Sequence, residues 1–144
     1  MENVQDLPVL FASVGVALIY VEALPGAKID GCSFFLAKMP VIGISGRGKR
    51  LDKVLFTLLQ EIAHVVLGHV TNETIVESLD DRDDRDGTEL EANRHAGRWL
   101  LPTPLPPVPE RIGAAWVENI AAERGLAPII VIGPAPERRS PSAA

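Results

Sequence analysis

The sequence has few cysteines and few basic residues, and each shortage excludes a class of protein. A single cysteine, Cys32, excludes a disulfide framework and fits a reducing compartment. Lys and Arg number 14 against 19 Asp and Glu, and the resulting net charge of −5 is unfavourable for holding a phosphate backbone. The first six residues carry no basic side chain, which argues against a secretory signal.

Long apolar runs and phosphate loops are also missing. The longest apolar run, residues 9–21, is interrupted by Ser13 and Gly15 and is shorter than the roughly 20 residues that span a bilayer. The glycine-containing stretch 46–50 is not followed by G-K-[ST], so it is not a phosphate loop. We therefore expect a cytoplasmic protein that contacts neither membranes nor, by itself, nucleic acid.

The remaining composition is that of a folded domain. The chain has 144 residues, of which 47% are hydrophobic and 23% charged, and this size predicts one domain. We expect the domain to cover residues 1–133 and a disordered tail to cover residues 134–144. The predicted elements are a helix over 7–14, strands over 16–22, 32–37 and 41–45, and helices over 51–70, 88–101 and 110–124.

Local signals set several of these boundaries. Thr88 and Glu91 form a capping box that predicts the start of the second long helix, and Pro102 ends it. Gly125 is placed as the stop of the last helix. The acidic stretch over 73–86 is interpreted as a solvated loop. A cation-binding loop is the alternative, although the spacing of an EF-hand is not met.

The helix predicted over 51–70 carries a polar group inside an otherwise apolar pattern, at Gln60-Glu61-Ile62-Ala63-His64. Positions 60 and 64 lie about 40° apart on one helical face. This is the spacing of the zinc signature H-E-x-x-H, in which two imidazoles bind the metal and the glutamate polarises the bound water. Here Gln60 replaces the first histidine. The competing interpretation is a half-exposed helix with His64 at its rim.

The next predicted helix offers a third ligand. Zinc in catalytic sites takes three protein ligands and keeps a fourth position for water. Glu89 or Glu91 can supply a carboxylate, and Asn93, one turn after Glu89, can steady it. The alternative for Glu89 is a first-turn acid that interacts with the helix dipole.

Together the two segments resemble the ImmA/IrrE family of zinc metallopeptidases. Members carry a helix that reads approximately F-T-x-x-H-E-x-x-H-x-x-x-G-H and, after a loop, E-x-x-A-N-x-F-A-x-x-L-L-x-P. Here residues 56–69 read FTLLQEIAHVVLGH and residues 89–102 read ELEANRHAGRWLLP. The resemblance covers roughly residues 7 to 132. It implies a zincin-like α+β fold with a small three-stranded sheet packed on an active-site helix and two or more further helices.

The resemblance also implies roles for individual residues. His64 corresponds to the second zinc ligand and Glu61 to the general base. The family's third ligand stands three residues before the alanine, which selects Glu89. Gly68 lies near the metal face, where it lets backbone or substrate approach closely.

Two positions depart from the family pattern, Gln60 in place of histidine and His95 in place of phenylalanine. An amide oxygen is a poorer zinc ligand than imidazole, so zinc is expected to be held weakly or not at all. Three explanations stay open: a degenerate peptidase, a site of His64, Glu89 and water alone, or an engineered inactivation. Continued helix geometry places His69 about 140° from His64 and His95 about 120° from Glu89, so neither is a convincing replacement, although the sequence leaves His95 open.

The family resemblance also implies partners. Members act on or bind helix-turn-helix repressors of the XRE type, which links them to transcription regulation and stress responses. The predicted function is a zinc endopeptidase acting on such a repressor, impaired by Gln60. The alternative is a catalytically inactive module that binds the regulator. In zinc peptidases of this general architecture, the strand directly before the site helix is an edge strand that pairs with an extended peptide, so the resemblance implies substrate binding by strand addition at 41–45. The apolar residues of 41–45 fit a core strand equally well.

Overall fold

A computed structural model describes residues 4–22, 30–45, 50–70 and 82–132, with the backbone alone for Val4 and for residues 82–86. The chain divides into two compact units, Met1–Thr103 and Pro104–Ala144. The predicted boundary at residue 133 begins a tail that lies outside the described residues, so that division stays a prediction. After a 3-10 turn at Val4–Asp6, the elements are α1 (Leu7–Ser13), β1 (Ala17–Val21), β2 (Gly31–Leu36), β3 (Met39–Ser45), α2 (Leu51–Val66), α3 (Arg82–Leu100), α4 (Ala114–Arg124) and α5 (Pro128–Ile132).

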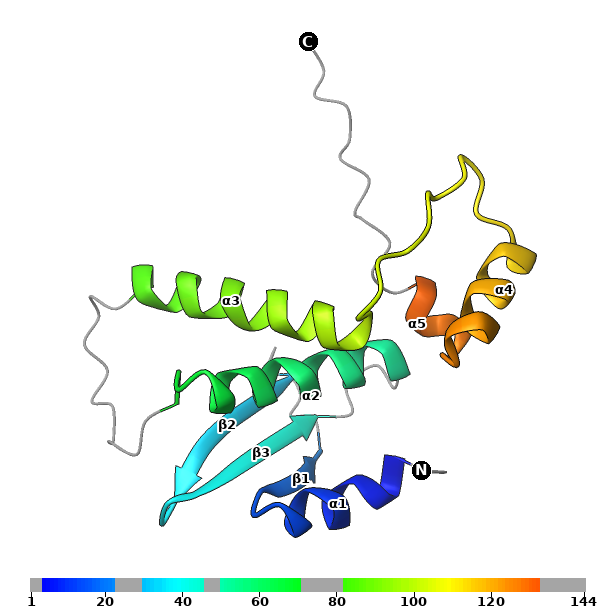
Figure 1. Cartoon of the computed structure of the whole chain (residues 1–144). Helices are drawn as coiled ribbons and strands as arrows, with labels where there is room; N and C mark the ends of the chain where they lie inside the picture. Colours follow the sequence, from blue (N-terminus) through cyan, green and yellow to red (C-terminus); the bar gives the residue numbers. More distant parts are fainter. Residues whose placement is uncertain (1–3, 23–29, 46–49, 71–81, 133–144) are drawn as a thin grey trace. The chain divides into compact units, whose positions relative to one another are not determined.

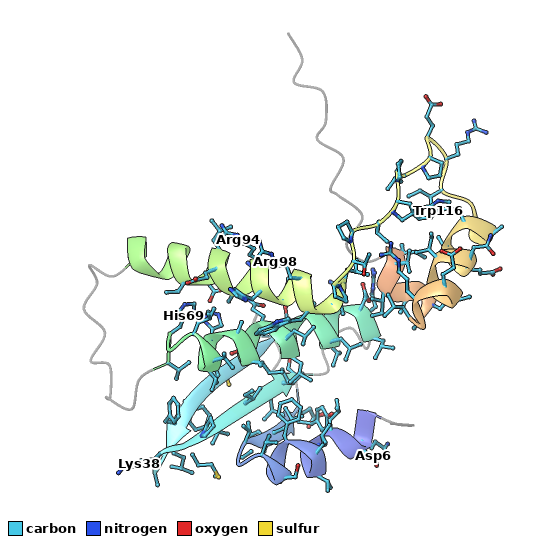
Figure 2. All side chains as sticks on the ribbon, viewed as in Figure 1. Asp6, Lys38, His69, Arg94, Arg98 and Trp116 are labelled. Carbon is cyan, nitrogen blue, oxygen red and sulfur yellow. The ribbon has the colours of Figure 1, made fainter. Side chains whose placement is uncertain are left out.

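The first unit is an α+β domain built on a three-stranded sheet, as the sequence predicts. The strand order is β1-β3-β2, with β1 parallel and β2 antiparallel to β3. Ala37 and Lys38 have φ values of 47° and 69° and form the two-residue turn between β2 and β3, which is the conformation of a tight hairpin. Figure 2 shows Lys38 at the tip of that hairpin.

Strand β3 is the central strand, and the prediction that it is an edge strand is wrong. Both of its sides are paired, with Ala17 aligned to Val41 on one side and Phe34 aligned to Val41 on the other. Val41 to Ser45 are all buried, so both faces of β3 are covered along this stretch. The same apolar run fits an edge or a central strand, so only the pairing could decide. The two edges of the sheet belong to β1 and β2.

Helix α2 lies between the sheet and α3, which runs along its outer side (Figure 1). The apolar positions that predict this helix bury it against the sheet. Leu58 of α2 packs with Leu18, Ile42 and Ile44 of the sheet and with Leu7 of α1. Ile42 and Ile44 are each 1% exposed, so this cluster is the core of the unit and fixes the orientation of α2.

Helix α2 ends earlier than the prediction of residue 70, at Val66. The amide of Gly68 donates to the carbonyl of Val65, and the amide of His69 donates to that of His64. Gly68 has φ +75°. This pair of bonds around a left-handed glycine is a Schellman motif, which terminates a helix. An added Cβ at Gly68 would meet no described atom within 4 Å, so its conformation rather than a close approach explains the glycine.

Helix α3 begins earlier than predicted, at Arg82 instead of Thr88. The capping box at Thr88 and Glu91 is a local signal only, and the residues before it contain no proline that would stop a helix. Residues 82–86 of the predicted acidic loop are therefore helical. Residues 73–81 of that loop lie outside the described part of the chain.

The second unit holds α4 and α5 around a small core of its own. Val117, Ile120 and Ala121 of α4 pack with Val131 of α5. Leu105 from the proline-rich segment and Trp116 pack against this cluster, and Arg124 donates to the carbonyl of Pro104 at 2.6 Å. The predicted stop of the helix is confirmed, because Gly125 is left-handed at its C-terminal cap. Among the described residues, no helix is both long and apolar enough for a membrane span.

Candidate functional site

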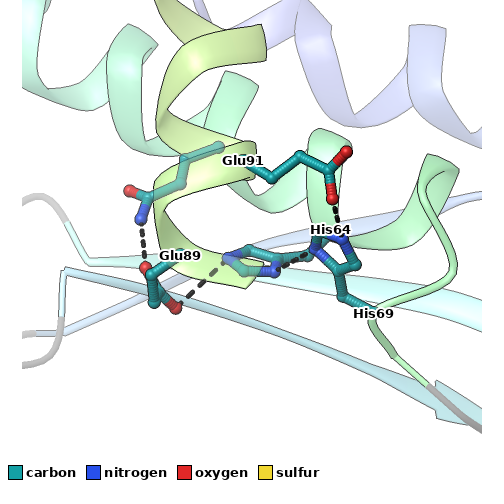
Figure 3. A network of polar contacts seen from close by, with 5 residues as sticks. His64, His69, Glu89 and Glu91 are labelled. Carbon is teal, nitrogen blue, oxygen red and sulfur yellow. Dashed lines mark hydrogen bonds and ion pairs between the residues drawn. The ribbon is translucent and has the colours of Figure 1, made fainter. Parts of the chain in front are cut away.

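The three predicted metal ligands, Gln60, His64 and Glu89, meet at one place between α2 and α3 (Figure 3). Gln60 Nε2 donates to Glu89 Oε2 at 2.8 Å. His64 Nε2 lies 3.3 Å from Glu89 Oε1. The helical spacing of positions 60 and 64 therefore directs both side chains at one carboxylate on the neighbouring helix. His64 is buried, whereas the side chain of Glu89 is 53% exposed, so the carboxylate stands at the open side of the site.

Glu61 points the other way, toward the sheet. Its side chain is buried and interacts with Ser33 of β2 by a hydrogen bond. Burial raises the pKa of the Glu61 carboxyl, the bond to Ser33 and the nearby His64 lower it, and the charge of Glu89 raises it. The net direction is upward, because desolvation of the charged form is the largest cause. A raised pKa brings a carboxyl closer to the range in which it accepts and releases a proton at neutral pH.

Strand β2 makes room for Glu61 with a glycine. An ideal Cβ at Gly31 would lie 2.6 Å from Thr57 Cγ2 and 2.9 Å from Glu61 Oε1. Those distances are too short for non-bonded atoms, so the close approach of the strand to the helix requires glycine here. Neither Gly31 nor Ser33 stands out in the sequence as a site residue. The one signal in the sequence is that both lie on the same face of the predicted strand, and the sequence does not show which helix that face meets.

His69 lies beside His64, and the prediction that it faces elsewhere is wrong. The two Nδ1 atoms are 3.1 Å apart, and His69 Nε2 lies 3.1 Å from Glu91 Oε2. The predicted angle of 140° assumed a continuous helix. The left-handed Gly68 instead folds the chain back, so that His69 returns over the last turn. Glu91, the competing candidate for the third ligand, therefore contacts His69, whereas Glu89 contacts His64.

Two further candidates from the sequence, Asn93 and His95, take no part in these contacts. His95 pairs with Trp99 on α3, with ring centroids 5.5 Å apart. Asn93 is exposed. Arg94 and Arg98 extend from the side of α3 that faces away from α2 (Figure 2). The polar network thus consists of Gln60, His64, His69, Glu89 and Glu91, and we use that name for it below.

The donor set of the polar network does not fit a zinc ion as it stands. Gln60 directs its amide nitrogen, a hydrogen-bond donor, at Glu89. Among the three predicted ligands, only His64 and Glu89 therefore offer strong metal-binding atoms. Catalytic zinc takes three protein ligands of the imidazole, thiolate or carboxylate type. Within residues 4–22, 30–45, 50–70 and 82–132, no group of three or more His, Cys, Asp or Glu is arranged to hold a metal. Zinc therefore has no step in the function proposed below.

An α+β unit whose sheet carries a helix with a polar Gln-Glu-x-x-His face, opposed by a carboxylate from the next helix, is a metallopeptidase-like domain. The family model of the IrrE N-terminal-like domain, Peptidase_M78, matches residues 14–108. This match covers more than half of the chain, and the chain belongs to that family. A search of curated proteins gave no match.

The raised pKa of Glu61 predicts a pH-dependent contribution to stability. In the window between the ordinary carboxyl pKa and the raised pKa, the folded chain binds more protons at Glu61 than the unfolded chain. Its contribution to the free energy of unfolding therefore falls as the pH rises through that window. The uncharged Glu61→Gln variant lacks this dependence. Relative to the parent, it should gain stability as the pH rises above the ordinary glutamate pKa of about 4.3, measured by urea unfolding at a series of pH values.

The control is Glu118→Gln, which changes an exposed glutamate on α4. Its stability curve should run parallel to that of the parent. If the stability curve of Glu61→Gln also runs parallel to that of the parent, desolvation is not the largest influence on the pKa of Glu61.

Proposed function

We propose that this chain is a metallopeptidase-fold module that binds a segment of a partner protein and, with Gln60 in place, does not cleave it. The partner class is a helix-turn-helix repressor of the XRE type, which the family resemblance implies. The module thus retains the architecture of a peptidase and uses it for recognition. This is the second of the two functions that the sequence leaves open.

The bond from Gln60 to Glu89 carries this proposal. At 2.8 Å it satisfies one carboxylate oxygen, while His64 stands 3.3 Å from the other. Glu89 thus already has partners on both carboxylate oxygens, and both partners are side chains of α2. A hydrogen bond to a charged group contributes about 1.5–3 kcal/mol, so a ligand must displace a favourable contact before it can use Glu89.

The edge of β2 is the surface that suits an extended peptide. The amide of Ser45 donates to the carbonyl of Asp30 at 2.9 Å, which makes this pair the hydrogen-bonded kind. Because such pairs alternate in an antiparallel ladder, Gly31, Ser33 and Phe35 direct their backbone groups away from β3. An added strand would bond to these groups. It would run close to Glu61, since Ser33 and Gly31 both approach that side chain.

A pair of proline substitutions tests this arrangement of β2. Phe34→Pro removes an amide that bonds to β3, whereas Phe35→Pro removes an amide that points to the open edge. Both variants lose a phenylalanine. We expect Phe34→Pro to be at least about 1 kcal/mol less stable than Phe35→Pro, although Phe34 is the more exposed residue. Equal losses in urea unfolding would contradict the register. If a peptide adds at this edge, Phe35→Pro should also weaken its binding.

The proposed function is tested with a purified XRE-type repressor. The parent chain should bind it in a calorimetric titration and leave it intact in mass spectra after incubation with zinc. Glu89→Gln, which keeps the shape of the side chain, serves as the matched variant for binding. Cleavage by the parent, dependent on Glu61, would overturn the proposal and restore the endopeptidase. Absence of binding to any repressor tested would remove the partner class.

The endopeptidase is the second candidate, and Glu61 favours it. A base that is buried, hydrogen-bonded and raised in pKa is more than a binding module requires. The two functions differ at one position. If Gln60→His together with zinc cleaves the repressor, and the additional change Glu61→Gln stops cleavage, the fold retains a complete peptidase apart from residue 60.

A further inference from the structure

The sheet of the first unit has one face that none of its described helices covers. Helices α1 and α2 both pack against the face that carries Leu18 and Ile42. Because side chains alternate along a strand, their neighbours point to the opposite face. An ideal Cβ at Gly43 would lie 3.1 Å from Cys32 Sγ and 3.8 Å from Ile19 Cγ1. All three strands therefore present residues on this second face.

The large side chains on the second face are apolar and exposed. By the alternation along each strand they are five, between 42% and 60% exposed: Ile19, Val21, Phe34, Leu36 and Met39. Together they present on the order of 500 Å² of apolar surface, which is in the size range of patches that mark interaction sites. We call these five residues, together with Cys32, the uncharged face.

The absence of charge decides which partner this face suits. Residues 17–21, 31–36 and 39–45 contain no Asp, Glu, Lys or Arg. The whole chain carries a net charge of −5, so two copies repel each other in most orientations. A two-fold interface brings the same patch of both copies together. The uncharged face meets its own copy without placing like charges side by side, and it offers no charged group that would select an unlike partner.

We propose that two copies of this chain pack through their uncharged faces as a two-fold dimer. Sheets commonly pack face to face, about 10 Å apart, with the side chains of the two inner faces interdigitating. Two such faces would bury on the order of 1,000 Å², which is about the least that a specific interface requires. We therefore expect a micromolar dissociation constant. The polar network lies on the other side of the sheet, at α2, so the dimer leaves it open and goes beyond the proposed function.

Sedimentation equilibrium under reducing conditions tests the dimer. The parent should pass from monomer to dimer over micromolar concentrations. Leu36→Glu brings an unpaired carboxylate into the interface from both copies and should weaken the dimer at least about 100-fold. The matched control is Leu90→Glu on α3, because Leu90 is 61% and Leu36 60% exposed, and it should dimerise like the parent. A parent that stays monomeric up to about 1 mM, or equal dissociation constants for the two variants, would overturn the proposal.

The labelling rate of Cys32 shows which face is covered. Cys32 is the one cysteine of the chain, and its Sγ lies close to Gly43 of the central strand. Its reaction with a maleimide should slow as the concentration of the parent rises, in step with the fraction of dimer. In Leu36→Glu the rate should stay constant over the same range.

Three labelling results would overturn the second copy as the occupant. A dimer with unchanged labelling would place the contact on another surface. Slow labelling at every concentration would mean that a segment of the same chain covers the face. Protection that appears only after a purified XRE-type repressor is added would assign the face to an unlike partner. If Leu36→Glu does not fold, sedimentation and labelling of the parent decide alone.

Discussion

Gln60→His should convert a chain that holds zinc weakly into one that binds it roughly 100-fold more tightly. A four-ligand zinc site contributes about 10–16 kcal/mol, so one strong ligand supplies about 3 kcal/mol, which corresponds to that factor. The change removes the donor that now occupies Glu89 and supplies an imidazole on the face shared with His64. Competition titration with a zinc indicator measures the gain.

Two further variants make the gain specific. Gln60→Leu also removes the bond to Glu89 but offers no ligand, so it should stay as weak as the parent. Adding Glu89→Gln to Gln60→His should abolish most of the gain. If Gln60→His binds zinc no better than Gln60→Leu, then His64 and Glu89 are not ligands. The family assignment would stand, but the site residues would not.

Gly31→Ala should destabilise the first unit by about 1–3 kcal/mol, which is the usual cost of an added atom in a packed interior. The new Cβ would be 2.6 Å from Thr57 Cγ2 and 2.9 Å from Glu61 Oε1, so β2 and α2 must separate or Glu61 must move. Urea unfolding gives the loss. Gly97→Ala is the control, because no described atom lies within 4 Å of its added Cβ and alanine favours a helix.

The cause of the loss can be separated from general effects of alanine in a strand. Thr57→Ser removes Cγ2, the atom nearest to the new methyl group. In the Gly31→Ala background it should recover part of the lost stability, a coupling that a double-mutant cycle detects. Strict additivity of the two changes would mean that the strand shifts away from α2 instead of contacting Thr57.

Much of the fold follows from the sequence because periodic apolar residues determine local structure. The strands and the start of α2 agree with the prediction to within two residues, and the pairing of Gln60 and His64 with Glu89 was expected from helical spacing and the family resemblance. The strand order was not accessible. The apolar run over 41–45 fits an edge or a central strand, and only pairing with distant residues distinguishes them.

The errors at the site have one local origin, the end of α2. Val65 and Val66 continue the apolar pattern, so periodicity alone extends the helix to residue 70. Gly68 carries the signal for termination, but beside the metal face a glycine is explained equally well by close approach of backbone or substrate. A helix that continued to residue 70 would direct His69 away from His64. The left-handed glycine reverses that direction, and the contact of His69 with Glu91 follows from it.

The contacts between α2 and α3 also define how the two helices align lengthwise. Glu89 contacts His64 and Glu91 contacts His69. The two histidines lie before and after the turn at Gly68. A slide of α3 by a single turn, about 5.4 Å, would separate both pairs at once and leave both carboxylates without these partners. The two helices therefore have one favourable lengthwise register, with or without a bound ligand.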